Sequence, residues 1–140
     1  MAISSIDFSA QFGGLDAENH VLPHFKALKK ACKSIEIVNF PFRNLTFILR
    51  VDGKIRSFNF SGLEKIKTAS SKEYISIDLG IMRKDYGQIE KVISESVLSS
   101  TNLLINVFAK MKLKYDIGSL KSNIQRLVSN YKDDIKNIDL

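Results

Sequence analysis

Residues 44–60, NLTFILRVDGKIRSFNF, carry the strongest local signal in the chain. Apolar and polar residues alternate on both sides of Asp52-Gly53, a dipeptide that favours a type I′ turn because both turn residues need positive φ. This spacing predicts a β-hairpin in which Phe47 faces Phe58. The core side of the hairpin is expected to carry Leu45, Phe47, Leu49, Phe58 and Phe60. The opposite side is polar enough to remain in contact with water.

Shorter strand patterns flank the hairpin. Residues 6–12 alternate between apolar and polar side chains, and residues 35–40 are typical of a strand that Pro41 ends. Residues 74–79 alternate again, and residues 63–67 suit a further short strand or a turn. Together with the hairpin, these patterns predict an antiparallel sheet of about four strands.

The remaining segments have helical periodicity. Residues 16–32 repeat apolar side chains every three or four positions, although Pro23 moves the expected start of the regular helix nearer Leu22. Residues 86–112 form a long apolar stripe, and the segment after residue 116 repeats apolar side chains at the same spacing. We therefore expect one helix before the sheet and two after it.

The composition is that of a folded protein. An apolar content of 44% excludes a disordered chain, and two prolines and seven glycines exclude a fibrous or low-complexity protein. A length of 140 residues fits one domain. Residues 1–140 are therefore expected to form a single α+β domain, with an N-terminal helix, an antiparallel sheet and two C-terminal helices packed on one face of the sheet.

Several features favour the cytoplasm. Cys32 is the only cysteine, so the chain cannot form an intramolecular disulfide, which suits a reducing compartment. The opening residues MAISSIDFSAQFGG lack the basic and apolar regions of a signal peptide. The charge-free stretch between Glu95 and Lys110 is too short and too polar to span a bilayer. We expect a cytoplasmic protein with no membrane partner.

The formal net charge of +6 raises the question of nucleic-acid binding. The positive excess is spread along the chain, and one local cluster stands out, formed by Lys26, Lys29, Lys30 and Lys33 on one side of the predicted first helix. Such a cluster is more often the solvated face of an amphipathic helix than a phosphate-binding surface. A basic nucleic-acid-binding module that uses these four lysines is kept as the alternative function.

Catalytic and metal-binding residues are sparse. His20 and His24 are four positions apart, which is a helical spacing for metal ligands, but no HExxH pattern or second cysteine accompanies them. Asp78 lies within a predicted strand, where aspartate is disfavoured, and would need a partner if buried. A small hydrolase or metalloenzyme would need a pocket that unites at least two of His20, His24, Cys32 and Asp78. We expect neither enzymatic activity nor a metal or other cofactor.

The centre of the chain resembles an immunity-protein family of bacterial polymorphic toxin and contact-dependent growth inhibition systems. The resembling positions are Leu45–Gly53, Phe58, Phe60, Gly62, Glu64, Lys65 and Tyr74–Ile81. The resemblance implies a small cytosolic protein, without catalytic activity, that binds one cognate toxin domain and occludes its functional surface.

The net charge qualifies this implication. Inhibitors of nuclease toxins are commonly acidic because they meet a surface built for phosphates, and a +6 chain departs from that pattern. Either the toxin is not a basic nuclease, or it contacts a locally acidic face of this protein. The candidates for such a face are Glu64, Asp78, Asp85 and Glu90. We expect the toxin-binding surface to include Arg50, Arg56, Tyr74, Asp78, Arg83 and Tyr86, which lie on the solvent-exposed face of the predicted sheet or in the loop leading into the long helix.

Overall fold

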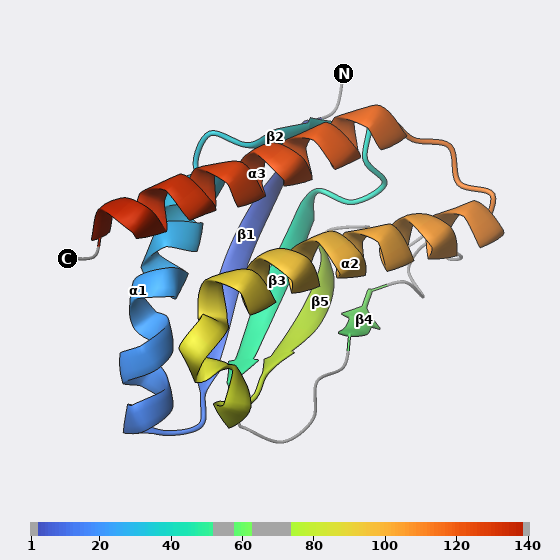
Figure 1. Cartoon of the computed structure of the whole chain (residues 1–140). Coiled ribbons are helices and arrows are strands. Elements are labelled where there is room, and N and C mark those ends of the chain that lie inside the picture. Colours follow the sequence, from blue (N-terminus) through green and yellow to red (C-terminus); the bar gives the residue numbers. More distant parts are fainter. Residues whose placement is uncertain (1–2, 52–57, 63–73, 139–140) are drawn as a thin grey trace.

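The computed structural model describes residues 3–51, 58–62 and 74–138 and has an α+β fold. The elements, in chain order, are β1 (Ile3–Phe12), α1 (Leu15–Cys32), β2 (Glu36–Val38), β3 (Asn44–Val51), β4 (Phe58–Ser61), β5 (Tyr74–Ile81), the 3₁₀ segment η2 (Arg83–Gln88), α2 (Ile89–Lys110) and α3 (Ile117–Ile138). The three helices lie on one face of a five-stranded mixed sheet (Figure 1). The α+β class is therefore confirmed, but the sheet begins with an N-terminal strand that precedes the first helix.

The sheet is mixed rather than antiparallel. Its strand order is β2-β1-β3-β5-β4, and β3 runs parallel to both of its neighbours, β1 and β5. Only the two edge strands, β2 and β4, are antiparallel to the strands they pair with. The predicted hairpin is wrong, because β4 pairs with β5 and never with β3. The Asp52-Gly53 dipeptide and the possible strand at 63–67 lie outside the described residues.

The parallel arrangement has a physical advantage over the hairpin. It aligns three strands along which apolar and polar residues alternate. As a result, Phe8, Phe47 and Ile77 form one buried row across the sheet. The rings of Phe8 and Phe47 are stacked with centroids 5.2 Å apart. The row of Ile6, Leu45 and Ile75 is buried beside it. Strand β4 has only four residues and would bury much less apolar surface beside β3.

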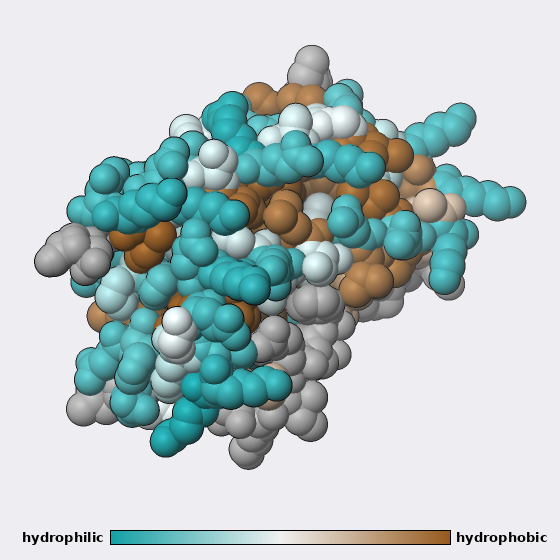
Figure 2. All heavy atoms as spheres, in the orientation of Figure 1, coloured by the Kyte–Doolittle hydropathy of each residue, from teal (hydrophilic) through white to brown (hydrophobic). Residues whose placement is uncertain are grey.

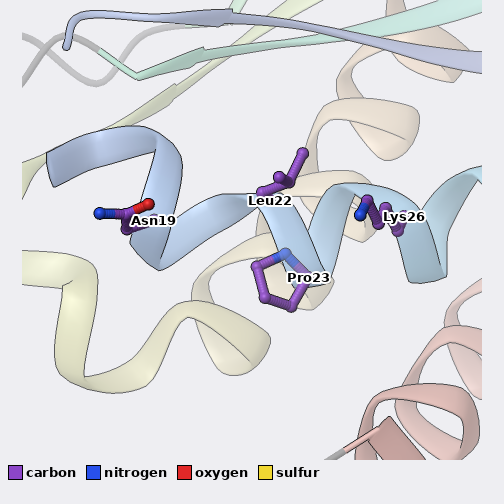
Figure 3. Close-up of a pocket in the computed structure, with 4 residues that line it drawn as sticks. All are labelled: Asn19, Leu22, Pro23 and Lys26. Atoms are coloured by element: carbon purple, nitrogen blue, oxygen red, sulfur yellow. The ribbon is translucent and has the colours of Figure 1, made fainter. Parts of the chain in front are cut away.

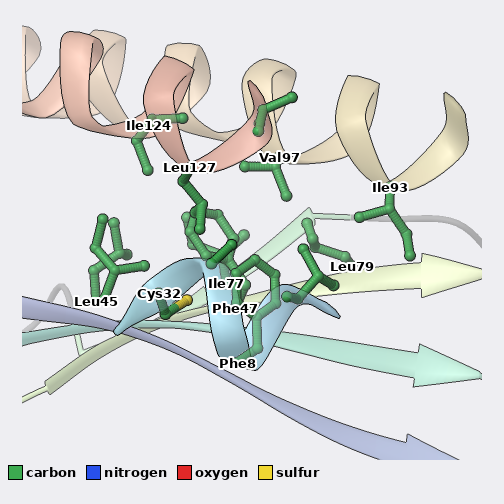
Figure 4. Packing of buried hydrophobic residues seen from close by; sticks show 14 of the residues in the cluster. Phe8, Cys32, Leu45, Phe47, Ile77, Leu79, Ile93, Val97, Ile124 and Leu127 are labelled. Carbon is green, nitrogen blue, oxygen red and sulfur yellow. The ribbon is translucent and has the colours of Figure 1, made fainter. Parts of the chain in front are cut away.

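The helices close the core over these rows. Figure 4 shows Ile93 and Val97 of α2 and Ile124 and Leu127 of α3 above the strand residues Phe47 and Leu79, among others. All of the labelled side chains belong to one cluster of buried residues. The third helix presents the apolar stripe expected from its sequence, since Leu120, Ile124, Leu127 and Tyr131 are buried.

The boundaries of α1 and α2 differ from those expected. Helix α1 begins at Leu15 and retains Pro23 in its interior, whereas a start nearer Leu22 was expected. Residues 83–88 form η2, in which the Asp85 carboxylate accepts the backbone N–H of Met82 at 2.8 Å, so that α2 begins only at Ile89. By length and composition, Arg83–Lys110 could cross a bilayer, but half of its most apolar stretch is buried inside the fold.

The free edge of β1 is covered by a charged pair. Strand β2 pairs only with residues Ile3–Ser5 of β1. Beyond that point the Asp7 carboxylate accepts the backbone N–H of Phe8 at 2.8 Å and the Lys29 ammonium of α1 at 2.7 Å. A charged side chain and a helix at this position hinder edge-to-edge pairing with another chain.

We expect the buried row to dominate stability. Replacing Phe47 with alanine should lower the free energy of unfolding by about 3–5 kcal/mol, because a large side chain leaves a cavity in a packed core. The control Ser9→Ala changes an exposed residue on the opposite face of β1 and should cost no more than about 0.5 kcal/mol. Urea unfolding monitored by circular dichroism measures both values, and similar losses in the two variants would contradict this assignment of faces.

Candidate functional site

The face of the sheet opposite the helices is polar. Its described residues alternate with the buried rows, and we call them the open face: Ser5, Asp7, Ser9 and Gln11 of β1, Asn44, Thr46, Ile48 and Arg50 of β3, and Tyr74, Ser76 and Asp78 of β5. All three helices lie on the other side of the sheet (Figure 1). Parallel strands usually bury both faces, so a polar second face is a distinctive feature of this fold.

An arginine is held on the open face near the carboxyl ends of the parallel strands. The guanidinium of Arg50 donates to Oδ2 of Asp78 through Nη2 at 2.8 Å and through Nε at 3.2 Å. Its Nη1 donates to Oε1 of Gln11 at 2.5 Å. Side chains from the two strands that flank β3 therefore hold one guanidinium, and Asp78 has the partner that its position in a strand requires.

A second polar network lies toward the start of the parallel strands. Asn44 donates its amide N–H to Oγ of Ser5 at 2.8 Å and accepts a short hydrogen bond from the hydroxyl of Thr46. Tyr74 is aligned with Asn44 in the same row of the sheet, and its exposed fraction is 66%. Ile3, on the same face of β1, is 58% exposed. This end of the open face therefore combines an exposed aromatic ring with an exposed aliphatic side chain.

The predicted contact residues fall into two groups. Arg50, Tyr74 and Asp78 share the open face, as expected from the alternation of their strands. Arg83 and Tyr86 lie in η2 and contact α1 instead. The ring of Tyr86 stacks on His20 with centroids 4.6 Å apart, and the Arg83 guanidinium lies 4.0 Å from the Asp16 carboxylate. Arg56 is outside the described residues.

The four candidates for an acidic contact face are not gathered on one surface. Asp85 is buried inside η2, and Asp78 is engaged by Arg50 on the open face. Glu90 is partly buried at the start of α2, and Glu64 is outside the described residues. Of the four, the structure places only Asp78 on the open face.

The lysine cluster of α1 is divided by ion pairs. Lys29 reaches Asp7 on the open face at 2.7 Å, whereas Lys30 approaches Asp134 of α3 at 3.9 Å. Lys26 and Lys33 are exposed. Two of the four charges thus already have carboxylate neighbours in different elements, which weakens the case for a continuous phosphate-binding surface.

The residues that hydrolase or metal chemistry would need have separate partners. His20 contacts Tyr86, His24 contacts Tyr131, and Asp78 contacts Arg50. Burial and the nearby Asp7 raise the pKa of the Cys32 thiol to about 12, despite the opposing effect of Lys29, so the thiol remains protonated. Within residues 3–51, 58–62 and 74–138, no three His, Cys, Asp or Glu side chains are placed to hold a metal ion.

A pocket of about 290 Å³ lies beside α1 and is lined, among the described residues, by Asn19, Leu22, Pro23 and Lys26. Figure 3 shows that Leu22 and Pro23 point in different directions from the helix. The lining offers one amide and one ammonium group, whereas ligand sites usually combine several convergent polar groups. The open face is the better candidate site.

One polar contact was not anticipated from the sequence. Nδ1 of His24 in α1 lies 2.7 Å from the hydroxyl of Tyr131 in α3, which is completely buried. Burial lowers the pKa of His24, and the nearby Glu90 carboxylate only partly opposes this effect. With the imidazole neutral, the Tyr131 hydroxyl can donate to Nδ1. Both residues lie on apolar stripes of their helices, so no local pattern marks them as partners.

The His24 contact predicts a pH dependence of stability. The unfolded chain takes up a proton near pH 6.5 whereas the folded chain takes it up at lower pH, so stability should be lost as the pH falls below about 6.5. Thermal unfolding between about pH 7.5 and pH 5 measures this loss. The His24→Gln variant should have a flatter profile, and the exposed-site control His20→Gln should behave like the unmodified protein. Parallel profiles for His24→Gln and the unmodified protein would contradict the prediction.

Comparison with known protein families, with curated proteins and with solved structures finds no match to this chain. Any function assigned to it must therefore follow from its own surfaces. Among the described surfaces, the open face has the most developed arrangement of polar, charged and aromatic side chains.

Proposed function

We propose that this protein is an immunity protein that binds a cognate toxin domain through the open face and neutralises it by occlusion. The observation that carries the proposal is that the open face presents both an ordered guanidinium, Arg50, held by Gln11 and Asp78, and an exposed tyrosine, Tyr74, toward the other end of the same face. The resemblance of the central strands to immunity proteins supports the same function. No catalytic step is needed, because a bound inhibitor blocks a toxin by covering its functional surface.

The geometry of the open face suits protein recognition. Arginine and tyrosine are enriched among the residues that dominate binding energies at protein interfaces. Arg50 is already ordered by two neighbouring side chains, so little conformational entropy is lost when a partner contacts it. Tyr74 and Ile3 project from the sheet and can bury apolar surface against a partner.

The open face has a low net charge, although the whole chain is positively charged and inhibitors of nuclease toxins are commonly acidic. Arg50 is paired with Asp78, and Asp7 is paired with Lys29, so these charges largely cancel. The positive excess of the chain lies mostly elsewhere, including the exposed lysines of the helical layer. The open face therefore suits a polar partner surface of low net charge and does not require a strongly acidic toxin.

Two substitutions on the open face test the proposal. The proposal implies that the toxin is the C-terminal domain of a secreted protein whose gene lies beside the gene for this chain. Co-expression of this chain should then restore growth to cells that produce that toxin domain. Tyr74→Ala and Arg50→Ala should each weaken binding by about 2 kcal/mol, or roughly thirtyfold in Kd, and reduce the rescue of growth. Isothermal titration calorimetry measures the affinities.

The matched control for Arg50→Ala is Arg126→Ala. Arg126 lies on α3, in the helical layer, and donates to the backbone carbonyl of Ser34. This variant should bind the toxin with unchanged affinity. Full rescue by the double variant Tyr74→Ala/Arg50→Ala would exclude the open face as the binding surface, and failure of the unmodified chain to restore growth would exclude the immunity function.

A further inference from the structure

The junction between α2 and α3 carries three lysines within five residues, which we call the basic tip: Lys110, Lys112 and Lys114. All three are exposed, and among the described residues none lies within ion-pair distance of a carboxylate. Asp116 is close in sequence, but its Oδ1 accepts the backbone N–H of Ser119 at 2.9 Å and caps the start of α3. Figure 2 shows polar side chains extending from this end of the molecule.

The backbone of the basic tip contains a residue with positive φ. Lys112 has φ of +56°, the left-handed conformation that commonly ends a helix and that favours glycine. Its N–H donates to the carbonyl of Ala109 at 3.0 Å, and the N–H of Leu113 donates to that of Phe108 at 3.1 Å. Both hydrogen bonds would form equally well with glycine at position 112. The lysine side chain is therefore present at a position where the backbone would be less strained without it.

The basic tip is also firmly anchored. Leu113 and Tyr115 alternate with the lysines and pack against the core, where the Tyr115 ring meets Phe108 edge-on with centroids 5.2 Å apart. The backbone N–H of Asp116 donates to the carbonyl of Asn39 at 3.1 Å. Because the apolar members of the alternation are held inward, the intervening lysines remain directed to solvent.

Two exposed aliphatic side chains flank the lysines. Leu103 lies two turns before Lys110 on the same side of α2, and Ile117 is the first residue of α3. Each is 44% exposed, which is unusual for such side chains in this protein, where most large apolar residues are buried. Ile117 thus adjoins the lysines at one end of the helical layer, and Leu103 lies about 10 Å from Lys110 along the same side of α2.

We propose that the basic tip and its flanking residues Leu103 and Ile117 bind the surface of an anionic lipid bilayer. Lysine ammonium groups are attracted to the negative surface potential of such a membrane, and aliphatic side chains enter the boundary between headgroups and acyl chains. The expectation of no membrane partner came from the lack of a spanning segment and does not address surface binding. The open face lies on the other side of the sheet and stays accessible, so this proposal is independent of the toxin-binding function (Figure 1).

The composition of the basic tip favours lipid over other anionic partners. Protein interfaces are depleted of lysine and enriched in arginine and aromatic residues, and nucleic-acid sites use arginine forks and stacked aromatic rings. Residues 110–114 contain three lysines, one methionine and one leucine. Lysine ammonium groups bind anions without a fixed geometry. Together with aliphatic neighbours, they suit a fluid surface of phosphate and carboxylate headgroups.

Vesicle co-sedimentation tests the proposal with full-length protein. The unmodified chain should bind phosphatidylcholine vesicles that contain about a third phosphatidylserine, and should not bind pure phosphatidylcholine. The variant Lys110→Gln/Lys112→Gly/Lys114→Gln should lower the partition coefficient by about tenfold or more. Glycine at position 112 suits the local backbone, so this variant should fold, which circular dichroism checks.

The matched control removes three other exposed lysines, so that its net charge equals that of the basic-tip variant: Lys26→Gln/Lys33→Gln/Lys132→Gln. It should retain most of the binding, within about threefold. A third variant, Ile117→Asn, keeps all of the lysines and should bind several-fold less tightly than the unmodified chain. Equal losses in the two lysine variants, or no binding to the anionic vesicles, would overturn the proposal. Equally tight binding to a nucleic-acid duplex that also depends on the basic tip would overturn it in favour of a general polyanion site.

Discussion

The buried row of Phe8, Phe47 and Ile77 is the constraint on which the rest of the structure depends. It requires β3 to lie between two parallel strands, and the stacked phenyl rings at 5.2 Å fix the register of β1 against β3. Because side chains alternate along a strand, burying this row places the intervening residues on the opposite face. The three helices cover the apolar side, and the polar side becomes the open face.

This one-sided arrangement separates two surfaces with different chemistry. The open face is nearly neutral, with the Arg50 guanidinium held by Gln11 and Asp78 and with Tyr74 exposed near the start of β5. The helical layer carries much of the positive excess, including the lysines of the basic tip. A net charge of +6 is therefore compatible with a partner surface of low charge, because the excess is not concentrated where the proposed toxin would bind.

The sequence predicts on which face of the sheet each side chain lies better than it predicts which strands pair with one another. Alternation correctly assigned Leu45, Phe47 and Leu49 to the core and Arg50, Tyr74 and Asp78 to one polar face, because a period of two is a local property. The pairing of β3 with β4 was wrong, since a turn signal at Asp52-Gly53 carries no information on strands that arrive from elsewhere in the chain. The contact between His24 and Tyr131 was missed for the same reason, because it joins residues in different helices that are far apart in the sequence.

The strand order is the most direct point at which the account can be tested. In an NMR spectrum of the full-length protein, backbone and side-chain cross-peaks should join Phe47 to Phe8 on one side and to Ile77 on the other. These pairs are neighbours in the parallel register and lie on opposite sides of β3. Backbone cross-peaks between Phe47 and Phe58, as in the hairpin, would contradict the account, because they would remove the row that separates the buried face from the open face.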